Sequence, residues 1–430
     1  MNDRRIHEKN SVKKDEDLSK LEKQTQRKFQ RLNSIDFLKG FAIILVAFYH
    51  LSHYWFSPDW IWFNGFTLIF MDVFGPGLFL FLTALAITFN IHRKKGKIPD
   101  KVIRNRILTR GLVLMLMGTL VNLYLSQVWD FLYIDLPFPL NLWGYNILFF
   151  IGVFQIGSYI SYKLGSKLSI IIAIIIIVFG PPFAELIYYL NIDMLNHQSF
   201  NIIYFLLHYF ISSPIPQLPL FPWIAISFIS NIFGKLLYDA WNKRTYDKLM
   251  KLCYIFLISG IVFILISIFC DLTLYNPENL KAELYWYVKI INVANNQPIF
   301  PWKVFYGIPA FLIRAMGANI LFLSGLALLF MGFAFYFLDI KGKMNSFIRV
   351  NIFYGKVSLS IFMFPFFFAF VFSNVLPLWY TLIFYFITTA FLGFLMYIWK
   401  KYFYGIGTPE WIVGKALILV QKYTYDRLEK

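Results

Sequence analysis

Two histidines and one aspartate are the residues of this chain whose types and spacing could perform acid–base chemistry. His50 and His53 lie three apart near the end of an apolar run, FLKGFAIILVAFYHLSHYW, and share one face if that run is helical. Asp72 lies in the next apolar run, FMDVFGPGLFLFLTAL. If the two runs are antiparallel neighbours, Asp72 reaches about the depth of the histidines. A carboxylate that orients an imidazole lets the histidine act as a general base towards a hydroxyl or amine.

A structural role is the alternative for the same residues. Histidine near the outer end of a membrane helix is only mildly unfavourable, and Asp72 could simply bond one helix to another. The six histidines are too scattered for metal-ligand spacing, so no metal is expected. Other polar residues at membrane depth are expected to be interhelical hydrogen-bonding groups: Asn122, Asn146, Gln155, Asn231 and Asn319.

Composition indicates that these residues lie in a membrane. Of 430 residues, 59% are hydrophobic, 21% aromatic and only 15% charged, which is too apolar for one soluble core. Runs of about 20 apolar residues can cross the hydrocarbon core as helices. The sequence therefore predicts an all-α, polytopic transmembrane helix bundle of about ten spans. The spans are expected near Ile35–Trp55, Phe66–Phe89, Ile107–Leu125, Tyr145–Tyr162, Leu168–Leu186, Leu220–Tyr238, Leu252–Cys270, Met316–Leu338, Tyr354–Val375 and Trp379–Trp399.

The basic residues predict the orientation of the bundle. With the N-terminus in the cytosol, 36 of the 40 Lys and Arg fall in cytosolic segments, as the positive-inside rule requires. The net charge of +17 is thereby explained without nucleic acid as a partner. We expect a multi-pass protein of the cell membrane with both termini cytosolic. Its expected parts are a charged arm over 1–34, a membrane domain over 35–417 and a tail over 418–430.

Two segments do not fit a simple span. FNIIYFLLHYFI, Phe200–Ile211, is too short to cross a membrane and is expected to be an interfacial or re-entrant helix. VFYGIPAFLIRAMGANILF contains Pro309 and Arg314 and is expected to enter the eighth span obliquely or as a broken helix.

Short motifs follow one another from residue 31 to residue 417. They are RLNSIDFLKGFAIILVAFYH, FGPGLFLFLTALAITF with RILTRGLVLMLMGTLVN, WGYNILFFIGVFQIGSYI, FPWIAISFISNIFGKLL, YGKVSLSIFMF and YGIGTPEWIVGKAL. In this order they resemble the transmembrane acyltransferase superfamily, in particular the branch of heparan-alpha-glucosaminide N-acetyltransferase and its prokaryotic relatives. Lys39 stands where that family has Arg, and Pro365 stands where many relatives have a late His. The loop FSPDWIWFNG also lacks the histidine that the lysosomal enzyme uses.

The resemblance implies an integral membrane O- or N-acyltransferase. Such an enzyme moves an acetyl or other acyl group from cytosolic acyl-CoA to a sugar or glycolipid at the outer side, as in polysaccharide modification. It implies His50 as the catalytic base, with Asp72 as its partner and His53 as the alternative. Plausible partners of the CoA phosphates are Lys39, Arg104, Arg106, Arg110 and Lys356, although ordinary positive-inside bias also explains them.

Two other classes of function stay open. A transporter or flippase for a lipid-linked sugar would use the same polar groups for passage, without acyl transfer. It would more naturally show repeated halves with broken helices in matching places, and the sequence shows no convincing internal repeat. In a membrane scaffold, the polar groups would serve packing alone. Both a monomer and a homodimer remain open.

Overall fold

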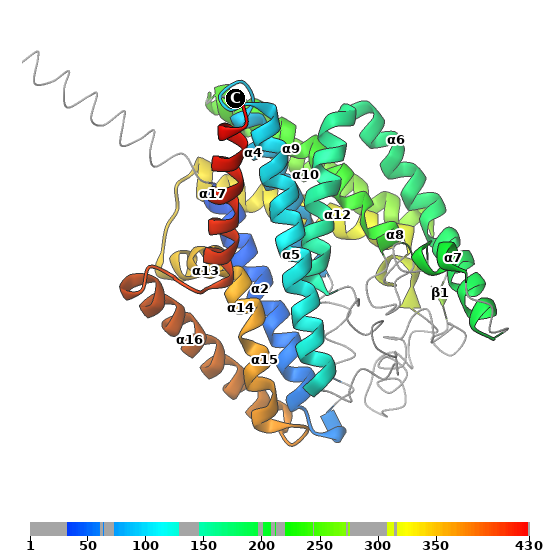
Figure 1. Ribbon diagram of the computed structural model, residues 1–430, viewed down its shortest axis with the longest axis vertical. Coiled ribbons are helices and arrows are strands. Elements are labelled where there is room, and N and C mark those ends of the chain that lie inside the picture. The colour runs from blue at the N-terminus through cyan, green and yellow to red at the C-terminus, as the bar shows by residue number, and fades with distance from the viewer. Residues whose placement is uncertain are drawn as a thin grey trace, which may run out of the picture.

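The computed structural model shows a bundle of packed helices, several of which cross one another obliquely (Figure 1). It describes residues 32–60, 63, 73–128, 146–196, 201–207, 211, 220–243, 245–271, 274–275, 308–313 and 316–428. The only strands in these ranges are β1 (Leu274–Tyr275) and β2 (Ile308–Pro309), which form one antiparallel pair. The all-α prediction is confirmed. The helices are α2 (Asn33–Trp55), α4 (Leu78–Lys94), α5 (Asp100–Val128), α6 (Ile147–Asn196), α7 (Ile202–Leu207), α8 (Leu220–Trp223), α9 (Ala225–Lys243), α10 (Tyr246–Cys270), α12 (Gly317–Ala334), α13 (Ser346–Lys356), α14 (Ser358–Met363), α15 (Pro365–Phe368), α16 (Leu378–Tyr402) and α17 (Pro409–Asp426).

Eight helices in the described ranges are long and apolar enough to cross a membrane. One of them, α6, turns at Gly165, whose φ of 82° is left-handed, and therefore contains both the fourth and the fifth predicted spans. The short predicted helix at Phe200–Ile211 corresponds in part to α7. The predicted broken entry into the eighth span consists of β2 and a 3₁₀ turn at Ala310–Leu312 before α12 begins. Arg314 lies outside the described residues.

The ninth predicted span, Tyr354–Val375, is wrong as a single helix. The chain bends by 81° between α13 and the α14–α15 segment. The bend occurs at Val357, where φ is −116° and ψ is 27°, outside the helical region. Only α14, α15 and the following 3₁₀ turn at Ala369–Phe372 continue towards the far end of the bundle, while α13 crosses α2 at a steep angle (Figure 1).

Paired glycines allow three of the helix crossings. A Cβ on Gly40 of α2 would lie 1.8 Å from the carbonyl oxygen of Asn351, and a Cβ on Gly355 of α13 would lie 1.9 Å from that of Asp36. Gly111 of α5 faces Gly152 of α6, and Gly260 of α10 faces Gly325 of α12, in the same way. Backbones approach this closely only where no side chain intervenes. Four of these six glycines belong to motifs that carry the family resemblance: Gly40, Gly111, Gly152 and Gly355.

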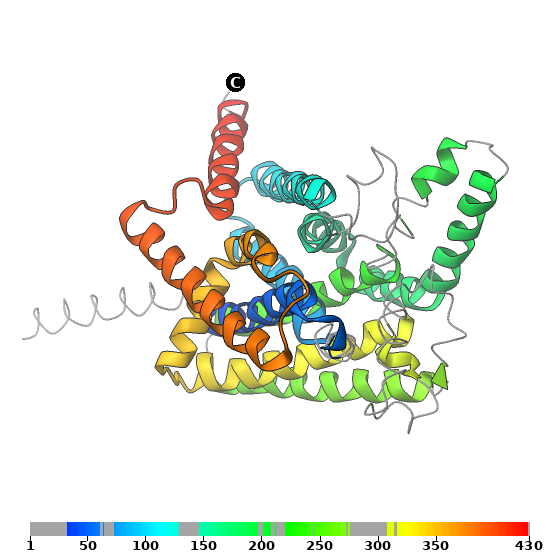
Figure 2. The same ribbon diagram turned by 90° about the horizontal axis from the view of Figure 1, so that it is seen from below.

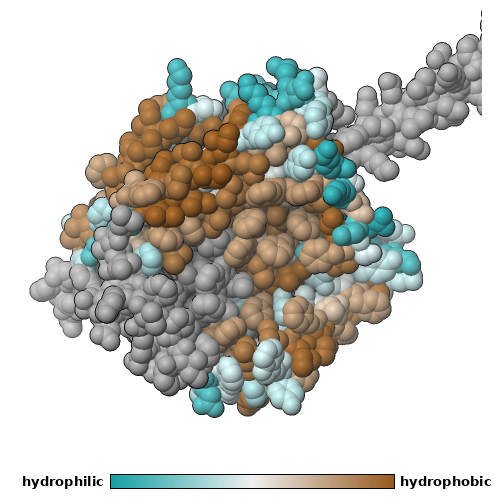
Figure 3. Space-filling model, turned by 180° about the vertical axis from the view of Figure 1, so that it is seen from behind, coloured by the Kyte–Doolittle hydropathy of each residue, from teal (hydrophilic) through white to brown (hydrophobic). Residues whose placement is uncertain are grey.

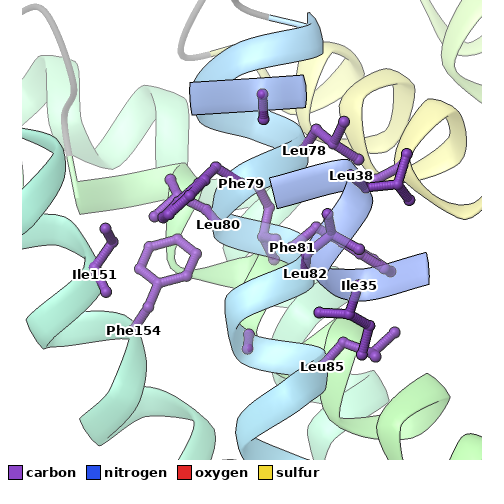
Figure 4. Packing of buried hydrophobic residues seen from close by; sticks show 14 of the residues in the cluster. Ile35, Leu38, Leu78, Phe79, Leu80, Phe81, Leu82, Leu85, Ile151 and Phe154 are labelled. Carbon is purple, nitrogen blue, oxygen red and sulfur yellow. The ribbon is translucent and has the colours of Figure 1, made fainter. Parts of the chain in front are cut away.

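The core lies where α2, α4 and α6 meet. Ile35 and Leu38 pack against the apolar face of α4, and Ile151 and Phe154 of α6 reach the same helix (Figure 4). Seen from below, α10 and α12 lie side by side along one edge, while the second half of α6 splays away from the bundle (Figure 2). Hydrophobic residues cover a broad part of the surface, and hydrophilic ones lie mainly at its upper and right-hand edges, with a few at the lower edge (Figure 3). This distribution is typical of a protein that lies in a bilayer.

Candidate active site

His50 lies at the interface between α2 and the α14–α15 segment. Its side chain is half-buried, and its ring centroid lies 5.7 Å from that of Phe362 and 5.0 Å from that of Phe366. The imidazole thus packs against two phenyl rings, and against the ring of Tyr49 at 5.6 Å, in the half of α2 that is farther from Asn33. Pro365, which stands where many relatives of the resembled family have histidine, neighbours one of these rings in the sequence.

The end of α2 that carries His50 is fixed by the segment after α15. The backbone N–H of Asn374 donates to Tyr54, and that of Leu376 donates to Trp55, both at 2.8 Å. The indole N–H of Trp55 donates to the carbonyl oxygen of Phe368 at 3.2 Å. The end of α2, four and five residues after His50, is therefore bound to the 368–376 segment by three hydrogen bonds.

The predicted partner of His50, Asp72, and the side chain of the alternative base, His53, both lie outside the described part of the structure. The described residues resume at Val73 with a π-helical turn, Val73–Gly77. His53 belongs to α2, one helical turn after His50. The pairing of an imidazole with Asp72 remains a prediction.

Lys39 lies inside the bundle, beside the start of α4. Its ammonium lies 5.7 Å from the ring centroid of Phe79, the second residue of α4. Helix α2 runs antiparallel to the start of α4, since a Cβ on Gly75 would approach Val46. From Phe79, α4 continues for roughly 22 Å at about 1.5 Å per residue before it ends at Lys94. Lys39 therefore lies far along the bundle from Lys94, the residue at which α4 ends.

The five predicted CoA-binding cations fall into two groups. Lys39 and Lys356 are both half-buried and neighbour Gly40 and Gly355, where α2 and α13 cross. The other three, Arg104, Arg106 and Arg110, lie on α5.

The side chains of two arginines on α5 donate hydrogen bonds. Arg106 donates to Gln421 of α17, and the Nε of Arg104 donates to its neighbour Asn105 at 3.3 Å. Arg110 is exposed and immediately precedes the crossing glycine Gly111. Of these bonds, that of Arg106 connects α5 to the C-terminal helix α17, and that of Arg104 stays within α5.

The polar residues predicted to bond helices together behave differently from one another. Asn146 donates to the Oδ1 of Asn122 at 2.8 Å and to the carbonyl oxygen of Gly118 at 2.6 Å, which joins α5 to the start of α6. Asn319 donates to the carbonyl oxygen of Phe311 at 2.9 Å. By contrast, the Nε2 of Gln155 and the Oδ1 of Asn231 are buried without a hydrogen-bond partner in the described part of the chain.

Two carboxylates that organise the bundle were not predicted. Asp339 accepts hydrogen bonds from the first residues of α2, and Glu410 accepts bonds from the backbone N–H and the hydroxyl of Ser360 at 3.0 and 2.5 Å. Glu410 belongs to GTPEW and Ser360 to YGKVSLS, so two of the late motifs contact each other. The sequence signal that could have indicated this contact is the presence of both motifs in the same chain. Within the described residues, no group of three or more His, Cys, Asp or Glu side chains could hold a metal ion.

A family model of the heparan-alpha-glucosaminide N-acetyltransferase catalytic domain matches residues 31–255, which is more than half of the chain. The chain belongs to this family. No curated protein and no solved structure matches it. The match covers α2 to the middle of α10 and therefore includes His50, Lys39 and the arginines of α5. The remainder contributes α13 to α17, which supply the rings around His50 and the carboxylate of Glu410.

The family is one of membrane acetyltransferases. The family's opening motif forms α2 and crosses α13 at Gly40. In this chain, the polar residue of α2 that faces the phenyl rings of the broken helix is His50.

Proposed function

We propose that the protein transfers an acetyl or other acyl group from acyl-CoA to a hydroxyl or amine of a sugar or glycolipid at the outer side. The proposal rests on the family match together with the position of His50, an ionisable residue half-buried between α2 and the broken α14–α15 segment. Ionisable groups at membrane depth mark functional sites because their burial is costly. The positive-inside pattern supports a cytosolic side for the donor.

The chemistry assigned to His50 is general base catalysis. A ring nitrogen takes the proton of the acceptor hydroxyl or amine while the acceptor atom attacks the thioester carbonyl carbon. The carbon–sulfur bond then breaks, and the sulfur leaves as a thiolate that receives the proton from the imidazolium. The products are the acylated acceptor and CoA with a free thiol, so atoms and charges balance. The surrounding phenyl rings limit the access of water, which would otherwise compete as the acceptor.

The two groups of basic residues are ranked differently as partners of the donor. Lys39 and Lys356, at the α2–α13 crossing, are roughly 17 Å from the level of His50 along α2 at about 1.5 Å per residue. This places them closer to the proposed reaction centre than Arg104 and Arg106, which contact residues at the α5–α17 interface. We assign the phosphates of the donor first to Lys39 and Lys356. Arg110, which is exposed on α5, stays a candidate partner of the phosphates.

The test is acyl transfer by the purified protein in lipid vesicles, measured with acetyl-CoA labelled in the acetyl group. His50→Ala should lower transfer about 10²- to 10⁴-fold, as expected for a lost general base. His53→Ala is the matched variant on the same helix and should retain most activity. Unchanged transfer by His50→Ala, at wild-type thermal stability, would contradict the catalytic role. Passage of a lipid-linked sugar without any acyl transfer would instead favour a transporter.

A further inference from the structure

A cavity of about 330 Å³ opens where α4, α5, α9 and the turn of α6 meet. Its wall carries three lysines, Lys95, Lys163 and Lys235, and one acid, Asp100. Asp100 lies 4.0 Å from the ammonium of Lys163, and both side chains are largely exposed. The lining therefore has an excess of positive charge, and the positive-inside rule places it on the cytosolic side.

Aromatic rings hold two of these lysines at the cavity. The ammonium groups of Lys95 and Lys163 lie 5.9 and 6.0 Å from the ring centroid of Tyr162. The ring of His92 meets the same tyrosine edge-on at 5.2 Å and stacks on Tyr238 at 5.6 Å. Cation–π contacts of this kind favour positions of the lysines at the wall over positions in bulk water. The arrangement predisposes the cavity to accept an anion.

The inner part of the cavity presents an unsatisfied polar group. Asn231 lines the cavity, is only 3% exposed, and its Oδ1 has no hydrogen-bond partner among the described residues. A buried polar atom without a hydrogen bond destabilises the fold unless a ligand or water supplies one. The Oγ1 of Thr88 in α4 and the Nε2 of Gln155 in α6 are also buried without a hydrogen-bond partner among the described residues. A ligand with a hydroxyl group would satisfy Asn231.

We propose that this cavity binds a phosphate ester that also carries a hydroxyl group. The lysines neutralise the phosphate, and the Oδ1 of Asn231 accepts a hydrogen bond from the hydroxyl. Two sources share this chemistry: the phosphoglycerol headgroup of an anionic lipid, and a soluble sugar or nucleoside phosphate. The volume is within the range of small-molecule sites, which begins at about 300 Å³.

The cavity is separate from the proposed acyl-transfer site. His92 lies roughly 20 Å along α4 from Phe79, and His50 lies roughly 17 Å along α2 from Lys39 in the opposite direction, at about 1.5 Å per residue. Because Lys39 contacts Phe79, the cavity and His50 are about 37 Å apart along the bundle, more than the roughly 30 Å hydrocarbon thickness. One donor molecule would have to extend through that distance to occupy both. The inference therefore does not depend on the acyl-transfer proposal.

The test compares two double variants that remove equal charge. Lys163→Gln with Lys235→Gln changes the cavity, whereas Lys251→Gln with Lys422→Gln changes two exposed lysines elsewhere. Full-length protein in detergent is incubated with phosphatidylglycerol or phosphatidylcholine, and bound lipid is counted by native mass spectrometry. In parallel, glycerol 3-phosphate and adenosine 3′,5′-bisphosphate are titrated, and binding is followed by thermal stabilisation.

Loss of phosphatidylglycerol binding by at least about tenfold in the cavity variant alone supports the lipid source. An equal loss for either soluble phosphate ester, with unchanged lipid binding, supports the soluble source. In both cases Asn231→Leu should weaken the same ligand, while inorganic phosphate, which lacks a carbon-bound hydroxyl, should bind less tightly to the wild type. Equal binding of every probe by the two double variants would overturn the proposal.

Discussion

The carboxylate of Asp339 accepts hydrogen bonds from the backbone N–H groups of Asn33 and Ser34, at 2.9 and 3.1 Å, and so caps the helix that carries His50. The N-cap residue of α2 is Leu32, whose side chain cannot accept such bonds. The first N–H groups of a helix have no partners within it, and an anion near them is further stabilised by the helix dipole. A residue about 300 positions away thus does what a local Ser or Asp usually does.

Removal of this cap should destabilise the start of α2. Asp339→Ala leaves two N–H groups of α2 without their acceptor, and we expect a loss of about 1–2 kcal/mol of stability. Asp339→Asn keeps one acceptor oxygen but loses the charge, and should cost less. The measurement is the thermal unfolding midpoint in detergent. Asp426→Ala, an exposed acid in the last turn of α17, is the control and should change stability by no more than about 0.5 kcal/mol.

The crossing of α2 and α13 should not tolerate a single methyl group. Gly40→Ala or Gly355→Ala would force two backbones apart, and we expect a loss of about 1–3 kcal/mol or failure to accumulate. Gly414 of α17 has nothing within 4 Å of its would-be Cβ and serves as the control. Gly414→Ala should be neutral or stabilising by up to about 1 kcal/mol, since alanine favours helix. Equal unfolding midpoints for all three variants would show that the crossing is pliable.

Hydropathy and charge were sufficient to predict most of the fold. The ten predicted spans correspond to seven single helices, the two halves of α6 and the bent α13–α15 segment, because length and apolarity determine which segments can cross a bilayer. The bend at Val357 could not be predicted in this way. It lies next to the close approach of Gly355 to α2, a tertiary contact that the hydropathy of YGKVSLSIFMF does not reveal.

The candidate site was predictable only in part. His50 stands out in an apolar run, so its sequence position alone drew attention to it. Its neighbours Phe362 and Phe366 could not be distinguished among 50 phenylalanines without the fold. Asp339 and Glu410 looked like ordinary acids at the edges of apolar segments, because their partners are backbone N–H groups of distant helices.

The bond between Glu410 and Ser360 should hold the C-terminal helix against the broken span. Glu410→Ala removes the acceptor of two hydrogen bonds at the start of α14, and α17 should then detach more readily. We expect faster tryptic cleavage at Lys415 and Lys422 in the folded protein. Glu410→Gln retains an acceptor and should show an intermediate rate. Thr424→Val removes the hydroxyl that accepts a hydrogen bond from Asn105 and so tests the other end of α17. Equal cleavage rates in wild type and Glu410→Ala would show that the end of α17 at Thr424, and not Glu410, holds the helix in place.

The ring of Phe366 should position His50 rather than act in the reaction itself. The two ring centroids lie 5.0 Å apart, and Phe366 is 4% exposed, so Phe366→Leu opens space beside the imidazole with little change in polarity. We expect kcat for acyl transfer to fall about tenfold while KM for acetyl-CoA changes little. If Phe366 acts through His50, the two substitutions are not additive, and Phe366→Leu should not lower the residual activity of His50→Ala. A tenfold further loss in the double variant, with its unfolding midpoint unchanged, would show that Phe366 contributes independently of the histidine.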